Sequence, residues 1–219
     1  AQGVFKFSKI DFFLAGSVSF TQFHRDGNTK NGLFPDNSKG KGTENEFTNY
    51  AGKAGITYKI DGRNYIFANG SYQTRAPYFE NVYISPRTRN AQQDNVTSET
   101  IQTVEAGYIM NAPKFKIRLG GYYTRFQDGM DVMSFYHDTY QNFVNYAING
   151  IDKLHFGGEF GLEVKVTPTI TLNAAAAVGR HLFTAQKMRS SQLVTIVLFQ
   201  GKQFYMAKTL KCPSNTWER

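Results

Sequence analysis

LHFGGEFGLEVKVTPTITLNAAAAV, residues 154–178, is the stretch that decides the fold. Apolar residues and one glycine occupy every second position over residues 154–166, and polar residues or glycine fill the positions between them. This alternation is typical of a β-strand with one apolar face and one polar face. Thr167-Pro168 interrupts the pattern, which resumes at Ile170 with the same period. The stretch therefore predicts two long strands joined by a tight turn.

The length of these strands narrows the class of protein. A strand in a soluble sheet has about 5 to 6 residues, whereas a strand that crosses an outer membrane at a tilt needs about 9 to 11. The strand over residues 154–166 reaches the membrane-spanning length. The mean hydropathy of the whole chain is that of a soluble protein, but a transmembrane barrel needs apolar residues only on its outward face and so averages out as polar.

The composition favours a β-rich chain. Aromatic residues make up 15% of the 219 residues, and 20 are glycine, as expected for a barrel with close turns and aromatic girdles at the membrane interfaces. The single cysteine, Cys212, excludes an internal disulfide framework. No run of about 18 apolar residues occurs, which excludes a transmembrane helix.

The net charge of +8 is compatible with an anionic partner such as nucleic acid or lipopolysaccharide. The basic residues are scattered, with short clusters only at Lys39 with Lys41 and at Arg87 with Arg89. Because no recognition helix or basic arm is present, we expect no nucleic-acid partner. We expect outer-membrane lipid and lipopolysaccharide to surround the protein.

Short and long connections alternate along the rest of the chain. Before the two strands of residues 154–178, we predict further strands over residues 12–25, 47–60, 65–74, 101–110 and 115–123. Tight turns are predicted at residues 8–11, 61–63, 111–114 and 167–168, and long polar loops at residues 26–46, 75–97 and 127–153. Asp61-Gly62 is the strongest hairpin signal. Short turns at one end and long loops at the other are the pattern of an outer-membrane barrel, with periplasmic turns and extracellular loops.

Four segments carry a resemblance to a known family. They are SYQTRAPYFENVYISPRTRN (71–90), SETIQTVEAGY (98–108), GYYTRFQDG (121–129) and GGEFGLEVKVTPTITLNAAAAVG (157–179). Over residues 12–184 the chain resembles the C-terminal part of the barrel of TonB-dependent outer-membrane receptors, particularly those of Bacteroidetes. The matching features are Ser98-Glu99-Thr100, Glu105, Gly107-Tyr108, Phe126 with Asp128, Gly157 to Glu159 and Thr167-Pro168.

This resemblance implies an all-β fold, an antiparallel up-and-down transmembrane β-barrel, of which this chain forms a partial barrel of about eight to nine strands. Residues 1–184 are the expected barrel segment, and residues 185–219 form a tail that fits either a further loop or a strand. A whole family barrel has about 22 strands around an N-terminal plug. Neither a plug nor a TonB-interacting segment is recognisable in this sequence.

The resemblance also implies a function. A receptor of this family, in the outer membrane of a Gram-negative bacterium, imports a scarce small-molecule or glycan ligand, such as a siderophore. The TonB complex drives this import through the plug. No enzyme activity is expected.

No catalytic residue, cofactor or metal site is expected either. The four histidines are far apart in the sequence, and none has a second ligand at metal-binding spacing. Glu159 and Glu163 share one face of a strand, but about 13 Å separates them, which is too far for the carboxylate pair of a glycosidase. We interpret both as polar lining of the barrel interior.

The long loops hold the residues that we predict to contact a ligand. Aromatic rings stack on sugars or chelates, and arginines pair with carboxylates. Alternatively, these aromatic residues form the interfacial girdle of the barrel or stiffen the loops. The predicted ligand-binding residues are Arg75, Tyr78, Phe79, Tyr83, Arg87 and Arg89 in the second long loop, and Tyr136, His137 and Tyr140 in the third.

Two other interpretations stay open at this point. A small eight-stranded barrel with a structural or adhesive role predicts a sheet that closes on itself. A soluble β-sandwich binding module predicts that the apolar strand faces pack against each other.

Overall fold

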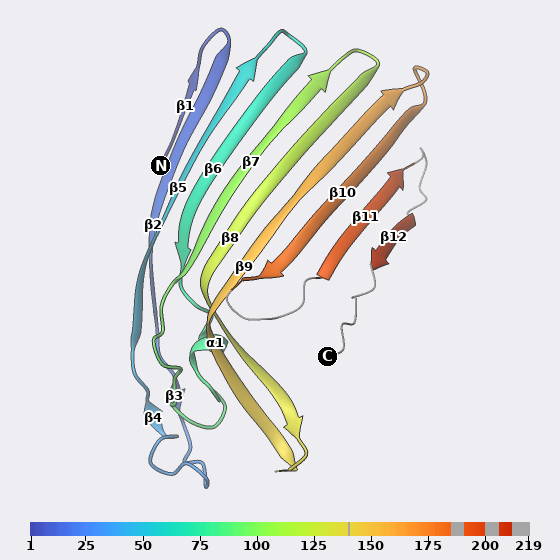
Figure 1. Cartoon of the computed structure of the whole chain (residues 1–219). Helices are drawn as coiled ribbons and strands as arrows, with labels where there is room; N and C mark the ends of the chain where they lie inside the picture. The colour runs from blue at the N-terminus through green and yellow to red at the C-terminus, as the bar shows by residue number, and fades with distance from the viewer. Residues whose placement is uncertain (140, 185–190, 200–205, 212–219) are drawn as a thin grey trace.

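The computed structural model describes residues 1–139, 141–184, 191–199 and 206–211, and ten of its strands form one curved antiparallel sheet (Figure 1). The strands follow one another across the sheet in sequence order. They are β1 (Gln2–Lys6), β2 (Ile10–Phe23), β5 (Asn45–Lys59), β6 (Asn64–Arg75), β7 (Glu99–Asn111), β8 (Phe115–His137), β9 (Asn142–Lys165), β10 (Thr171–Phe183), β11 (Ser191–Phe199) and β12 (Met206–Lys211). The connections hold the short ladder of β3 (Asp26–Gly27) with β4 (Gly40–Lys41) and the four-residue helix α1 (Phe79–Val82).

The sheet is an up-and-down meander that stays open. Each strand pairs with the next one, and β1 and β12 are the two edges of the sheet over the described residues. This confirms the predicted antiparallel partial barrel. The described sheet has ten strands, where about eight to nine were predicted. The closed eight-stranded barrel does not fit, because no ladder joins β1 to β12 in the part of the chain that the structure describes.

One face of the sheet, which we call the outer face, is apolar and exposed. On β2, Leu14, Val18 and Phe20 are 53%, 65% and 80% exposed. The buried apolar residues of the described chain are Phe67, Val82, Tyr83, Ile101 and Ile148. A soluble sandwich requires the opposite arrangement, with the apolar face packed inside. That interpretation is therefore wrong, and the outer face suits contact with lipid.

The opposite face, which we call the inner face, is polar. Asn69 and Glu105 are cross-strand partners on β6 and β7, and the Asn69 side chain donates a hydrogen bond of 2.6 Å to the Glu105 carboxylate. Further along the sheet, Lys116 on β8 and Glu163 on β9 form an ion pair of 3.1 Å. Polar side chains that satisfy one another in this way are typical of a barrel interior.

Glycine and aromatic residues fit together on the same inner face. The Phe67 ring lies over Gly107, its cross-strand partner, and a Cβ added at residue 107 would lie 2.6 Å from the ring. The Arg118 guanidinium lies 5.5 Å from the centre of that ring. An aromatic side chain that covers a cross-strand glycine shields the backbone and fixes the register of the two strands.

Replacing Gly107 with valine should therefore destabilise the wall by about 1 to 3 kcal/mol, because a Cβ there would lie 2.3 Å from the Leu119 carbonyl oxygen and 2.6 Å from the Phe67 ring. The measurement is the denaturant-induced unfolding of the full-length protein in detergent micelles. Gly52→Val is the matched control, because a Cβ at residue 52 has no neighbouring atom within 4 Å. Equal stability of the two variants would contradict the proposed packing.

The short turns lie at one end of the sheet, at the top of Figure 1. They cover residues 7–9, 60–63, 112–114 and 166–170, close to the predicted positions. In the second turn, one Asp61 carboxylate oxygen accepts the backbone N–H groups of Arg63 and Asn64 at 2.7 and 2.8 Å. These bonds, together with the Asn64 side chain, hold the pKa of Asp61 below its usual value. These hydrogen bonds explain why an aspartate stands at the start of this hairpin turn.

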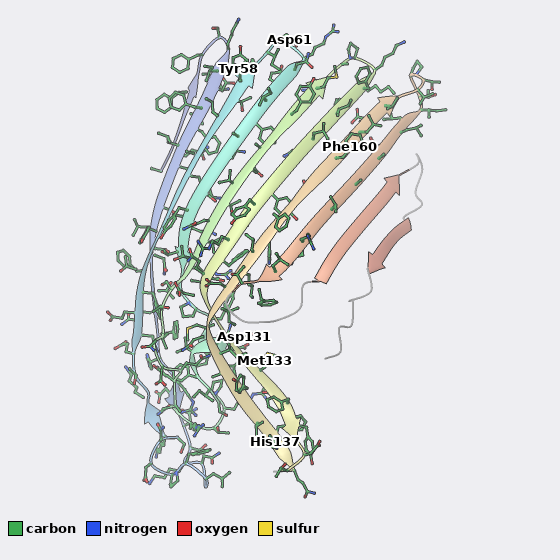
Figure 2. The ribbon with its side chains drawn as sticks, viewed as in Figure 1. Tyr58, Asp61, Asp131, Met133, His137 and Phe160 are labelled. Atoms are coloured by element: carbon green, nitrogen blue, oxygen red, sulfur yellow. The ribbon has the colours of Figure 1, made fainter. Side chains whose placement is uncertain are left out.

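The prediction of a long loop over residues 127–153 is wrong. β8 continues to His137 and β9 begins at Asn142, so these residues mainly extend the hairpin past the rest of the sheet (Figure 2). The pairing shifts register between Phe126 and Asp131, and Asp128 and Gly150 adopt positive φ angles of 59° and 65°. Such bulges break the alternation by which a strand is recognised in sequence.

The other two long connections are correctly placed but contain regular structure. The first holds β3 and β4, and the second holds α1. No helix in the described residues has both the length and the apolarity needed to cross a membrane.

Spin labels along β9 test the assignment of the two faces. Labels at Phe156, Phe160 and Leu162 should be accessible to oxygen, and labels at His155 and Glu159 to a water-soluble nickel reagent, because successive side chains lie on opposite faces. The measurement uses the full-length protein in a lipid bilayer. Shielding of the three apolar positions from both reagents would mean that this face packs against protein.

Candidate functional site

The long connections gather at the end of the sheet opposite the short turns (Figure 1). We call residues 24–44 the first connection, residues 76–98 the second connection and residues 129–151 the hairpin extension. The second connection is bonded to both of the others. The Asn90 backbone N–H donates to the Asn37 carbonyl at 2.7 Å, and the Asn81 side chain donates to the Met130 carbonyl at 2.8 Å. The three segments therefore form one braced assembly.

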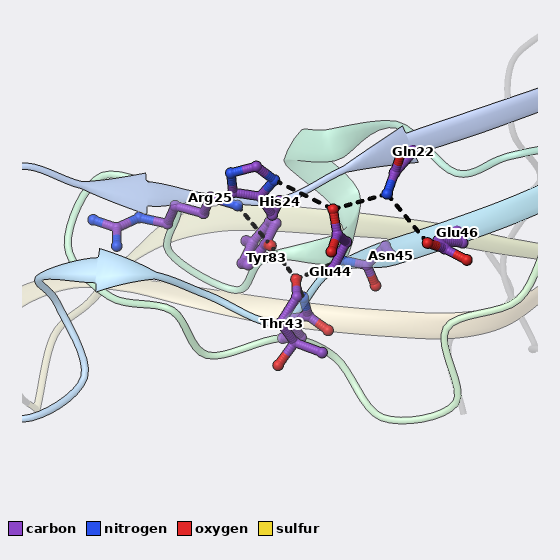
Figure 3. Close-up of polar contacts among 9 residues, drawn as sticks. Gln22, His24, Arg25, Thr43, Glu44, Asn45, Glu46 and Tyr83 are labelled. Atoms are coloured by element: carbon purple, nitrogen blue, oxygen red, sulfur yellow. Dashed lines mark hydrogen bonds and ion pairs between the residues drawn. The ribbon is translucent and has the colours of Figure 1, made fainter.

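Arg25 and Tyr83 are at the centre of this assembly (Figure 3). The Arg25 backbone N–H donates to the Tyr83 hydroxyl at 2.9 Å, and that hydroxyl donates to the Thr43 carbonyl at 3.1 Å. The buried Arg25 guanidinium donates to the carbonyls of Pro86 and Ser38 at 2.5 and 2.9 Å. One residue thus joins the first connection to the second.

Tyr83, which we predicted to contact a ligand, has no exposed surface. Its ring packs 4.9 Å from that of Phe79, and its hydroxyl is used within the assembly. The structure thus gives Tyr83 a place in the packing of the loops. Sequence reasoning missed Arg25, because a single arginine at the end of a strand carries no signal that its contacts lie about 60 residues away.

Replacing Arg25 with methionine should loosen the loops and leave the wall intact. The variant keeps the apolar stem but leaves the carbonyls that Arg25 now bonds without a donor, at a cost of about 2 to 3 kcal/mol. Hydrogen exchange of the full-length protein should therefore become faster in the first and second connections, and not in β7. Arg63→Met, at the opposite end of the sheet, is the control. Unchanged exchange in both connections would contradict the assigned role.

A cleft of about 340 Å³, which we call the mouth cleft, lies where the inner face meets the second connection. The strands β2, β5 and β6 supply its wall, and Ala76 to Phe79 supply its rim. The structure therefore brings together three of the predicted ligand-binding residues. The lining consists of Ser19, Thr21, Phe23, Asn49, Thr74, Arg75, Ala76, Pro77, Tyr78 and Phe79.

Two contacts orient Arg75 in the mouth cleft. Its guanidinium forms an ion pair of 2.5 Å with Glu99, its cross-strand partner, and lies 5.2 Å from the centre of the Tyr78 ring. The ion pair balances the charge of Arg75. Tyr78 is 62% exposed, so its ring remains available for stacking. Phe79 packs edge-on against Phe23, with their ring centres 5.9 Å apart.

Asn49 is the residue of the mouth cleft that the sequence did not reveal. It is the cross-strand partner of Ser19 and is only 3% exposed, and its side-chain oxygen has no hydrogen-bond donor among the described residues. A buried acceptor without a donor is costly, so this oxygen suits a donor from a bound molecule. Its position in a long alternating strand looks the same in sequence as that of any other polar inner-face residue.

The other predicted residues do not line the mouth cleft. Arg87 is exposed in the second connection, and the Arg89 guanidinium lies 4.6 Å from the centre of the Phe34 ring. In the hairpin extension, Tyr136 packs edge-on against Phe143, and the His137 ring lies 6.4 Å from that of Phe135. Tyr140 lies outside the described residues.

Two histidines that are distant in the sequence are neighbours in the structure. His155 and His181 are cross-strand partners on β9 and β10, with ring centres 4.3 Å apart and nearly perpendicular planes. The spacing of the histidines in the sequence gave no sign that these two are neighbours. Over the described part of the chain, no group of three or more His, Cys, Asp or Glu side chains is placed to hold a metal ion.

The two faces of the wall, the short turns at one end and the braced loops at the other define an outer-membrane β-barrel wall. The sequence matches the family model described as "TonB dependent receptor-like, beta-barrel" over residues 1–198. The chain therefore belongs to the TonB-dependent receptor β-barrel family, which confirms the resemblance found in the sequence. The narrower likeness to Bacteroidetes members stays a prediction.

Among solved structures, the chain is similar to one titled "Copper transporter OprC", with a TM-score of 0.68 and 14% sequence identity. The similarity covers 89% of this chain and 31% of that chain, so this chain spans about a third of the length of that protein. At this identity the likeness shows the fold alone. No curated protein matched the sequence.

Proposed function

We propose that the protein containing this chain is a TonB-dependent receptor that imports a scarce ligand across the outer membrane of a Gram-negative bacterium. The family match and the lipid-compatible outer face support this location. The long connections then lie outside the cell, where a ligand arrives, and outer-membrane lipid and lipopolysaccharide surround the wall. The TonB complex supplies the energy by acting on a plug. We expect neither an enzyme activity nor a nucleic-acid partner.

We further propose that the mouth cleft takes part in capturing the ligand. The observation that carries this proposal is that Arg75, Tyr78 and Asn49 lie around one cleft on the inner face. Tyr78 offers a ring for stacking, and Asn49 offers a buried acceptor. A ligand with a flat or ring-shaped face and hydroxyl or amide donors, such as a glycan or a siderophore, matches this chemistry.

The remaining predicted residues extend this proposal outward. Arg87 and Arg89 in the second connection and Tyr136, His137 and Tyr140 around the hairpin tip would meet the ligand before it reaches the mouth cleft. Loops braced by a rigid wall are the usual place for such contacts.

Ligand uptake by cells tests the proposal. Cells that carry the full-length protein should accumulate its ligand from a panel of radiolabelled siderophores and oligosaccharides, and cells depleted of TonB should not. The double variant Arg75→Ala with Tyr78→Ala should reduce binding by roughly tenfold to a hundredfold, because it removes a stacking ring and a charged hydrogen-bond donor. The measurements are uptake by whole cells and binding to purified receptor.

Arg63→Ala is the control, since residue 63 lies in a short turn at the opposite end of the wall. Surface labelling must give equal amounts of all variants. Uptake that persists without TonB would overturn the transport proposal. Normal uptake and binding in the double variant would remove the mouth cleft from the proposal and leave the transport function standing.

A further inference from the structure

A second cleft, with lining residues that differ from those of the mouth cleft except for Phe79, lies between the first and second connections. Its volume is about 480 Å³. Residues 24–31 form one side of it, and Pro86, Arg87 and Thr88 form the other, with Phe79 at the boundary. The lining side chains are mainly polar or charged. We call it the cationic cleft, for the reason that follows.

The charges around this cleft are unbalanced. Arg25, Lys30 and Arg87 line it, and Asp26 is the one carboxylate among its lining residues. Three positively charged side chains therefore line the cleft with one negatively charged side chain. Two glutamates lie near this cleft but do not line it: Glu44 and Glu46 accept hydrogen bonds from Gln22 at 2.8 and 3.1 Å, and Glu44 also lies 4.0 Å from the His24 ring (Figure 3).

One of the positive charges, that of Arg25, is fixed in place and is not on a flexible surface side chain. Its guanidinium is buried, and its bonded acceptors are the carbonyls of Ser38 and Pro86 and the side-chain oxygen of Asn90, which are all neutral. Among the described residues, no carboxylate oxygen lies within 4.0 Å of it. Neutral acceptors fix its position but do not cancel its charge.

Arg25 bonds to Ser38 and Pro86 because it joins the first connection to the second. This joining does not explain why Lys30 and Arg87, which have no part in it, line the same polar cleft. A fixed guanidinium with two further cations lining the same cleft is the arrangement that recognises an oxyanion.

We propose that the cationic cleft binds a phosphate or carboxylate group. Two sources of such a group are compatible with the site: a free anion or anionic ligand in the medium, or the phosphate groups of lipopolysaccharide in the surrounding leaflet. The extracellular position of the cleft rests on the proposed function, whereas the binding chemistry rests on the cleft itself.

Anion binding by the purified full-length receptor in neutral detergent tests the proposal. The probes are inorganic phosphate, citrate and lipid A in mixed micelles, and the readout is calorimetric titration. The double variant Lys30→Ala with Arg87→Ala should bind the effective probe roughly tenfold more weakly or worse, because two charge-assisted contacts are lost. Binding should also weaken as salt is raised. Arg25 is left intact so that the loops keep their bracing.

The matched control is Arg63→Ala with Lys114→Ala, which removes the same charge from the turns at the opposite end. Binding of phosphate or citrate that is lost only in the cleft variant identifies a free anion as the occupant, and binding of lipid A alone identifies the membrane. Either result supports the site. No binding of any probe, or an equal loss in both double variants, would overturn it. Failure of ligand uptake with this binding intact would count against the transport function only.

Discussion

The structure depends on one constraint, which is that a backbone surrounded by lipid has no water to satisfy its N–H and C=O groups. The long antiparallel ladders from β2 to β10 provide these partners strand by strand. Because the ladders satisfy the backbone, the outer face is free to be apolar throughout, and the inner face is free to hold pairs such as Asn69 with Glu105. The wide exposure of Val18 and Phe20 would be a defect in water and is a requirement in a bilayer.

Outside the membrane-spanning part of the wall, side-chain hydrogen bonds stabilise the connections. Hydrogen bonds of this kind to backbone carbonyls brace the connections, and Arg25 provides several of these bonds at once. Apolar packing contributes as well, because Val82 and Tyr83, in the second connection, are the most deeply buried apolar residues of the described chain. The loop end of the wall has a small core of its own.

The sequence predicted the wall well because period-two alternation is a direct consequence of strand geometry, and the Asp61 turn chemistry is local. It failed at the hairpin extension because Asp128 and Gly150 shift the period on both strands. It placed Arg75, Tyr78 and Phe79 in one group because they are neighbours along the chain, and the three residues line one cleft. Asn49, Arg25 and the pair of His155 with His181 were missed, since their partners are brought near only by the register of strands or by folded loops, which no local pattern encodes.

The length of the paired strands β8 and β9 has a mechanical consequence. The strands that form part of the wall continue, beyond two bulges, to the hairpin tip at His137 and Asn142. A paired ladder resists stretching and bending far better than a single loop does. One paired ladder therefore links the hairpin tip to the part of the wall that holds Tyr122 and Glu159.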